Sequence, residues 1–147
     1  MANHVRQQLR ERAATTVTSL TTTGARVFQG RVYPLTQAEM PGLLVYTNDE
    51  VVDGRTLSPP RTLDRRVQLV VEGRARGADV EDVLDTIAKE VEVAVYNDRT
   101  LNSLARDTAL QRTEVTLTGQ GDQAHGSVRL AFEVTYMARE NAPDVAT

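Results

Sequence analysis

The sequence contains no cysteine and no tryptophan, and aromatic residues make up only 4% of its 147 positions. The lack of cysteine excludes disulfides, thiolate metal sites and cysteine nucleophiles. The shortage of aromatic side chains argues against a platform on which nucleic-acid bases stack. No apolar run approaches the roughly 18–20 residues of a membrane-spanning helix, and the polar N-terminus lacks the apolar core of a signal peptide. We therefore expect a protein that is not inserted in a membrane.

The charge balance is mildly acidic, since 17 Lys and Arg stand against 20 Asp and Glu for a formal net charge of −3. This balance gives no general reason to expect nucleic-acid binding, which needs clustered positive charge. The length of 147 residues favours one domain. A domain of this size buries roughly 68–70% of its unfolded surface, which is enough to hold a core without disulfides.

Two segments have the spacing of amphipathic helices. In residues 3–20, apolar side chains recur at intervals of three and four, which places them in one stripe on one helix face. The same period runs through residues 80–95, after Asp79, a residue type that often caps a helix N-terminus. The two stripes are Val5, Leu9, Ala13, Val17 and Leu20, and Val80, Val83, Leu84, Ile87, Val91 and Val95.

Other segments are predicted to be strands. The first begins at residues 27–28 and is expected to resume at residues 32–33. Residues 43–46 are apolar on both faces, which predicts a covered, central strand. Residues 63–74 follow, with Val67, Leu69 and Val71 on one face. A closing hairpin joins strands over residues 113–118 and 128–136, and the second of these is apolar on one face only.

The remaining segments complete the predicted domain. Residues 47–61 hold several acids, a glycine and a proline pair, which predicts a long exposed loop. Residues 141–147 are predicted to be a flexible tail. Residues 1–140 then form a single domain with the order helix, strand, strand, strand, helix, strand, strand. This order predicts an α+β fold, in which a single mixed or antiparallel β-sheet packs against two α-helices.

The motifs that suggest catalysis or cofactor binding fail on their context. Residues 119–124, GQGDQA, match a dinucleotide-binding fingerprint, but a strand and not a helix is expected to follow them. Residues 49–54, DEVVDG, resemble half a calcium loop, but its third position is Val51 and its twelfth is Pro60. The only two histidines are isolated from each other, so a nucleophile–base pair is hard to assemble. We expect no catalytic residue, no metal and no cofactor, and therefore no enzyme.

Charged residues gather in and after the predicted loop. A solvated strand face is the simplest interpretation of this pattern. The alternative is a surface for another subunit or partner protein, because the planar arginine fork pairs bidentately with carboxylates. The acids of one subunit would then pair with the arginines of the next. The candidate interface residues are Asp49, Glu50, Asp53, Arg55, Arg61, Arg65, Arg66, Arg74 and Arg76.

Several segments, taken in order, resemble the tail terminator family of long-tailed phages. The resemblance begins with LRERAATTV (residues 9–17), TGARVFQGR (23–31) and EMPGLLVYTNDE (39–50). It continues through TLDRRVQLVVEG (62–73), an amphipathic helix with an acidic start, and LAFEVTYMARE (130–140). It covers about residues 4–139. The chain departs from the family pattern in a longer final hairpin turn and in the segment TLSPP (56–60).

This resemblance implies one sheet with helices against it and a ring of six subunits. The ring would sit on the tail tube protein, end polymerisation of the tube and offer a surface to the head–tail connector protein. DNA would pass through the pore without specific binding. The protein would lie at the head-proximal end of the virion tail after synthesis in the bacterial host cytoplasm. The alternatives are a head-completion or neck protein of the head–tail interface, and a small ligand-binding α+β domain.

Overall fold

The computed structural model describes residues 2–30, 35–121 and 124–147. It confirms the predicted α+β class, with two α-helices and one six-stranded mixed sheet. In chain order the elements are α1 (Val5–Thr16), β1 (Val27–Gln29), the 3-10 helix η1 (Gln37–Glu39), β2 (Gly42–Gly54), β3 (Thr62–Arg76), α2 (Val80–Asn97), β4 (Asp107–Thr118), β5 (His125–Arg139) and β6 (Ala142–Ala146).

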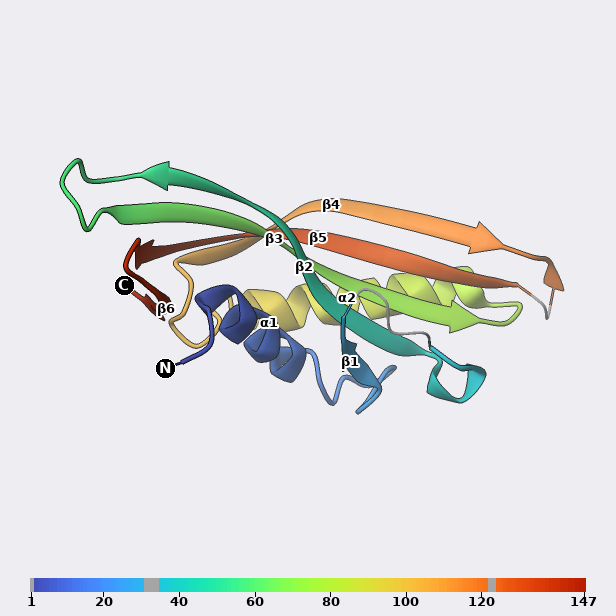
Figure 1. Ribbon diagram of the computed structural model, residues 1–147. Coiled ribbons are helices and arrows are strands. Elements are labelled where there is room, and N and C mark those ends of the chain that lie inside the picture. Colours follow the sequence, from blue (N-terminus) through green and yellow to red (C-terminus); the bar gives the residue numbers. More distant parts are fainter. Residues whose placement is uncertain (1, 31–34, 122–123) are drawn as a thin grey trace.

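The sheet is a single layer with the strand order β1-β2-β3-β5-β4, and β6 pairs with β5. β1 runs parallel to β2, whereas the other neighbouring strands are antiparallel. β3 and β5 form the centre and stay in register from Thr62 opposite Arg139 to Arg76 opposite His125. Both helices lie along the same side of this layer (Figure 1). We call that side of the sheet the helix face and the opposite side the open face.

The helices lie on the helix face because each buries its apolar stripe there. In α1, Val5 and Leu9 are fully buried, and α2 buries its stripe against the same core. Gly73 of β3 leaves room for this packing, since an added Cβ would lie 2.7 Å from the Cγ2 atom of Ile87. The strand residues of this main core include Leu43, Val45, Val67, Leu69, Val71, Val128, Leu130, Phe132, Val134 and Tyr136.

The predicted helix bounds are correct for α2 and too long for α1. α1 ends at Thr16 and not near residue 20. The hydroxyls of Thr15 and Thr16 donate to backbone carbonyls four residues earlier, and such bonds compete with regular helix geometry. Asp79 precedes α2 as predicted, but its side chain makes no capping hydrogen bond.

The first part of β2 is covered on both faces, as predicted for residues 43–46. Leu43 and Val45 belong to the main core on the helix face. Leu44 and Tyr46 belong to a second apolar cluster on the open face. The other members of this cluster are Val70 and Ala131, with Phe28 and Leu35 packed against it. The predicted resumption of the first strand at residues 32–33 lies outside the described residues.

The prediction of a long loop at residues 47–61 is wrong for its first half. β2 continues to Gly54 and pairs with β3, so that only residues 55–61 connect the two strands. The register shifts between Thr47 and Glu50, and this irregularity exchanges the faces on which successive side chains lie. The second half of β2 is therefore hard to predict from sequence. The alternation of inward and outward side chains is interrupted at the point where the composition becomes charged.

β4 is longer than predicted. It begins at Asp107 and not at residue 113. Its register with β5 shifts between Leu110 and Arg112, so the alternation before the shift does not continue after it. A search for a period of two therefore finds only the second half of this strand.

The prediction of a flexible tail is also wrong. Residues 142–146 form β6, which pairs with β5 and places Ala138 opposite Ala146. The backbone N–H of Thr147 donates to the carbonyl of Met137 at 2.9 Å. The C-terminal residues are therefore paired with β5, which their mixed composition does not indicate.

Two leucine substitutions test the assignment of the strand faces. Leu69 is completely buried in the main core, whereas Leu57 is 94% exposed. Leu69→Ala should lower the free energy of unfolding by roughly 2–5 kcal/mol, because it leaves a cavity. Leu57→Ala should change it by less than about 0.5 kcal/mol. Chemical denaturation of both variants measures these values, and equal effects would contradict the fold.

Candidate functional site

The far part of the β2–β3 hairpin, residues 47–66, carries most of the predicted interface residues, and we call it the arm. It extends beyond the N-terminal end of α1 (Figure 1). Its tip carries Leu57, which is the most exposed of the large apolar side chains in the described residues. Thr56 Oγ1 accepts a hydrogen bond from the backbone N–H of Thr62 at 2.9 Å, which closes the tip. The arm is thus a closed hairpin, and no side chain of the described residues covers Leu57 at its tip.

The exposed charges of the arm pair with one another. Arg55 Nε lies 3.0 Å from Asp64 Oδ2, and Arg66 Nη2 lies 3.2 Å from Asp53 Oδ2. Arg61 Nη1 lies 3.3 Å from Glu140 Oε2 at the end of β5. Exposed pairs of this kind contribute typically 0.2–1 kcal/mol each, so their effect is mainly on the conformation of the arm.

Glu50 and Arg65, two of the predicted interface residues, lie buried within the chain. Their side chains are only 6% and 9% exposed and face each other on the helix face, with Glu50 Oε2 3.4 Å from Arg65 Nη1. Arg6 of α1 approaches the same oxygen at 3.0 Å. The hydroxyl of Tyr136 donates to Glu50 Oε1. This cluster fixes the base of the arm to α1 and β5.

Burial shifts the pKa values of two groups near Glu50, Tyr136 and His4. Burial and the hydrogen bond to Glu50 raise the pKa of Tyr136 far above its ordinary value. His4 caps the N-terminus of α1, where its Nδ1 atom accepts the backbone N–H of Arg6 at 3.0 Å. Burial and the guanidinium groups of Arg6 and Arg65 lower the pKa of His4. His4 therefore stays neutral and keeps its capping lone pair at neutral pH.

The last three predicted residues lie apart from this cluster. Arg74 projects from the open face of β3 and pairs with Glu72 at 2.6 Å. Within the part of the chain that the structure describes, neither Asp49 nor Arg76 forms an ion pair. Of the predicted set, these two are the charges that could pair with a partner without breaking an ion pair among the described residues.

An edge of the sheet that sequence reasoning missed is β4. β4 is the last strand in the sheet order, and nearly all of its side chains are exposed. On the helix face, Leu110, Val115 and Leu117 are 38%, 51% and 45% exposed, so α2 covers them only in part. Their alternation was visible in residues 113–118, but sequence could not show that this strand lies at an edge. A long apolar edge is a surface that a second chain can pair with.

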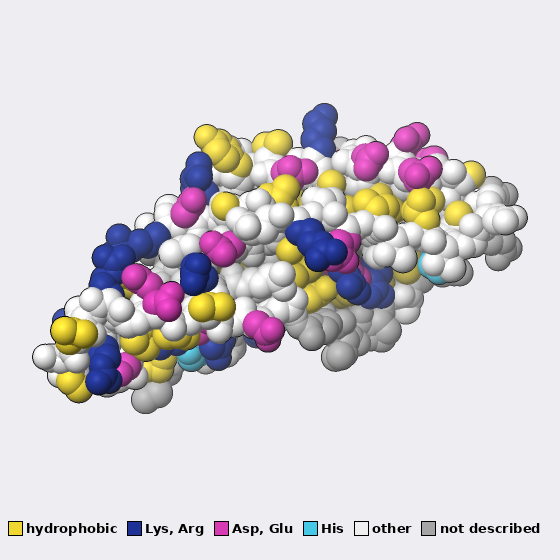
Figure 2. Space-filling model, turned by 90° about the horizontal axis from the view of Figure 1, so that it is seen from above, with side chains coloured by type: hydrophobic (Ala, Val, Ile, Leu, Met, Phe, Trp, Pro, Cys, Tyr) yellow, Lys and Arg dark blue, Asp and Glu magenta, His cyan; other side chains and the backbone are white. Residues whose placement is uncertain are grey.

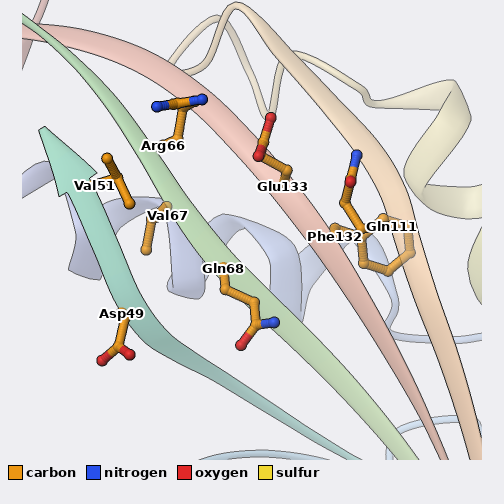
Figure 3. A pocket seen from close by; sticks show the side chains of 8 residues that line it. All are labelled: Asp49, Val51, Arg66, Val67, Gln68, Gln111, Phe132 and Glu133. Carbon is orange, nitrogen blue, oxygen red and sulfur yellow. The ribbon is translucent and has the colours of Figure 1, made fainter. Parts of the chain in front are cut away.

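A shallow pocket on the open face joins the arm to the rest of the sheet. Figure 3 shows its lining side chains, which come from four neighbouring strands. The space is about 330 Å³ and is lined by Asp49, Val51, Arg66, Val67, Gln68, Gln111, Phe132 and Glu133. This lining includes no histidine and no hydroxyl or thiol nucleophile, so it does not assemble a nucleophile–base pair.

Over the described ranges, no group of three or more His, Cys, Asp or Glu side chains is placed to hold a metal ion. In the same part of the chain, no helix has both the length and the apolar character to cross a membrane.

The neighbours Asp49 and Glu50 provide a matched test of the buried cluster. Glu50→Gln removes the charge that Arg6 and Arg65 share, and should destabilise the protein by roughly 3–5 kcal/mol, since buried guanidinium is left uncompensated. Asp49→Asn, at an exposed position one residue away, should change the unfolding free energy by less than about 0.5 kcal/mol. Denaturant melts of both variants decide the matter, and a stable Glu50→Gln protein would show that the cluster is not structural.

The lowered pKa of His4 predicts a loss of stability in mild acid. The unfolded chain binds a proton at His4 near pH 6.5, whereas the folded chain does so only at lower pH. Stability from this group is therefore complete above about pH 6.5 and falls as the pH drops below it. His4→Asn keeps a capping acceptor and does not titrate. Melts at about pH 7.5 and pH 5 should show a smaller loss for His4→Asn than for the unchanged protein, and equal losses would contradict the prediction.

No family model matches the chain. No curated protein matches it either. Among solved structures, a chain from the virion of a native gene transfer agent particle is similar, with 18% identity over 92% of each chain and a TM-score of 0.43.

Proposed function

We propose that this protein is a tail terminator of a long-tailed phage. Six copies form a ring that caps the tail tube, ends its polymerisation and joins the tail to the head connector. The protein acts by binding other subunits, and it uses no catalytic residue, metal or cofactor. The ordered set of segments that resembles the tail terminator family supports this proposal, because it runs through both helices and the central strands.

The observation that carries the proposal is a pair of uncovered surfaces, one on the arm and one on the edge strand β4. On one side the arm projects with exposed Val51, Val52 and Leu57. On the other side β4 presents its apolar edge. Two different patches on one chain make head-to-tail contacts, which give a closed ring when the rotation between subunits fits. An isolated monomer would have to keep both surfaces in water, where they promote aggregation.

The charge of the chain fits a pore through which DNA slides. A formal charge of −3 gives each subunit a mild repulsion toward phosphate. Attraction to DNA grows with each phosphate that a protein neutralises, and a strongly basic pore would hold the DNA in place. The protein would accordingly lie in the virion at the head-proximal end of the tail, without contact to a membrane.

A substitution on the β4 edge tests the ring. The unchanged protein should form six-fold rings, either free in solution or on tail tubes, as measured by light scattering and negative-stain electron microscopy. The double variant Val115→Lys, Leu117→Lys should remain folded, with an unfolding free energy within about 1 kcal/mol of the original. It should fail to form rings, because lysine on an edge strand opposes pairing.

Val93→Lys is the matched control. Val93 is 54% exposed on α2, so the substitution adds the same charge away from the sheet edge. Rings should persist in this variant. Rings that also persist in the double variant would exclude β4 from the interface. If the unchanged protein formed no ring and left purified tail tubes uncapped but bound a head–tail connector, the neck-protein alternative would replace this proposal.

A further inference from the structure

The open face carries a buried carboxylate for which neither the core nor the arm accounts. Glu72 of β3 is 2% exposed, although neither α1 nor α2 covers this face. Its Oε1 atom accepts hydrogen bonds from the Tyr46 hydroxyl at 3.0 Å and from Arg129 Nε at 2.8 Å. Its Oε2 atom accepts one from Arg74 Nε at 2.6 Å. One carboxylate thus holds two guanidinium groups side by side.

Glu72 holds each of its two arginines through the Nε atom alone. The side chains of Arg74 and Arg129 are 32% and 53% exposed. Among the described residues, neither guanidinium donates any hydrogen bond other than the one from Nε to Glu72. The terminal nitrogens of both forks therefore keep their donors for another acceptor, while Glu72 fixes the position of the forks.

Stability alone does not explain this arrangement. A buried ion pair costs desolvation that its attraction often fails to repay, so such pairs are weak evidence for stabilisation. Burial opposes ionisation of Glu72, but hydrogen bonds from Arg74 and Arg129 lower its pKa below the ordinary value. The carboxylate is charged at neutral pH and serves to position the two forks.

A hollow next to the forks has space for a small acidic group. It measures about 200 Å³, and hydroxyl side chains of Thr116, Thr118 and Ser127 line it beside Glu72 and the two arginines. Met40, which precedes β2, also lines the hollow, and the other lining residues come from β3, β4 and β5. The regular pairing of these strands around the hollow keeps their side chains in place. A site built on paired strands is more rigid than one built on loops.

The charge of the cluster indicates the ligand. Two guanidinium groups and one carboxylate leave a net charge of one positive unit, which a single carboxylate balances. The arginine fork matches a carboxylate through two parallel hydrogen bonds. We propose that Arg74 and Arg129, positioned by Glu72, bind the carboxylate of an aspartate or glutamate side chain that a partner protein presents.

A nucleic acid fits this face less well. Glu114 stands directly opposite Arg129 on the neighbouring strand, and Glu133 lies farther along β5. Figure 2 shows acidic and basic side chains interspersed over the open face, without a continuous basic stripe. An extended polyanion would meet these acids, whereas one side chain reaches the forks alone. The inference concerns the open face and holds whether or not the protein forms a ring.

The test follows the arginine side chains directly. Nitrogen-15 NMR of the folded protein resolves Arg Nε–H signals, and an acetylated and amidated hexaglutamate peptide serves as the probe. The signals of Arg74 and Arg129 should shift and saturate with added peptide. Arg74→Lys and Arg129→Lys keep the charge beside Glu72 and lose the fork, so each should weaken binding by about tenfold or more.

Arg66→Lys is the control, because Arg66 lies on the open face eight residues before Arg74 along β3, is 47% exposed and pairs with Asp53. It should leave the affinity within about twofold of the original, which is the scatter expected for a distant site. Thermal melts of each variant confirm that it is folded. Signals that do not saturate with the peptide, or equal losses in all three variants, would overturn the proposal. Tighter binding of a single-stranded oligonucleotide than of the peptide would also overturn it and assign the forks to phosphate.

Discussion

The long pairing of β3 with β5 is the constraint on which the rest of the structure depends. The two strands stay in register over 15 residues each, which is longer than either helix can cover as it crosses them. The helices cover the helix face from Ala75 and Val128 to Tyr136, whereas neither α-helix covers the open face or the tip of the arm. In those uncovered parts the strands still pair through their backbones, but side chains must be satisfied in some other way. Charged clusters and uncovered apolar edges follow from this shortage of covering layers.

Two clusters of the same composition meet that need on opposite faces of the sheet. In each, one glutamate accepts hydrogen bonds from two arginines and a tyrosine hydroxyl. Glu50 lies on the helix face, where α1 supplies Arg6 and the cluster closes around it. Glu72 lies on the open face, where both of its arginines remain part exposed. The same chemistry therefore anchors a helix in one place and presents donors to solvent in the other, and the difference is the presence of a covering helix.

The sequence reveals the parts of this fold that repeat and conceals the parts that interrupt the repeat. The stripes of both helices and the two-faced apolar segment at residues 43–46 were predictable, because burial there follows one period over several residues. Asp49 and Glu50 were not separable, although one is exposed and the other buried, since the register shift between Thr47 and Glu50 resets the alternation. The cross-strand ion pairs could not be predicted from the sequence either, because they depend on the register between strands, which only the folded sheet defines.

The ordered arm changes how subunit assembly should work in the proposed ring. A disordered loop that folds on contact loses part of its binding free energy to ordering. The arm is instead a paired hairpin, with Arg55, Arg66 and Arg61 each engaged within the chain. A surface that is ordered in advance loses less entropy when it docks, so a modest apolar contact gives more affinity. A rigid arm also fixes the angle between neighbours, and that angle determines whether head-to-tail contacts close into a ring or continue as a filament. The intrachain ion pairs would therefore act on assembly through geometry, although each contributes little to stability.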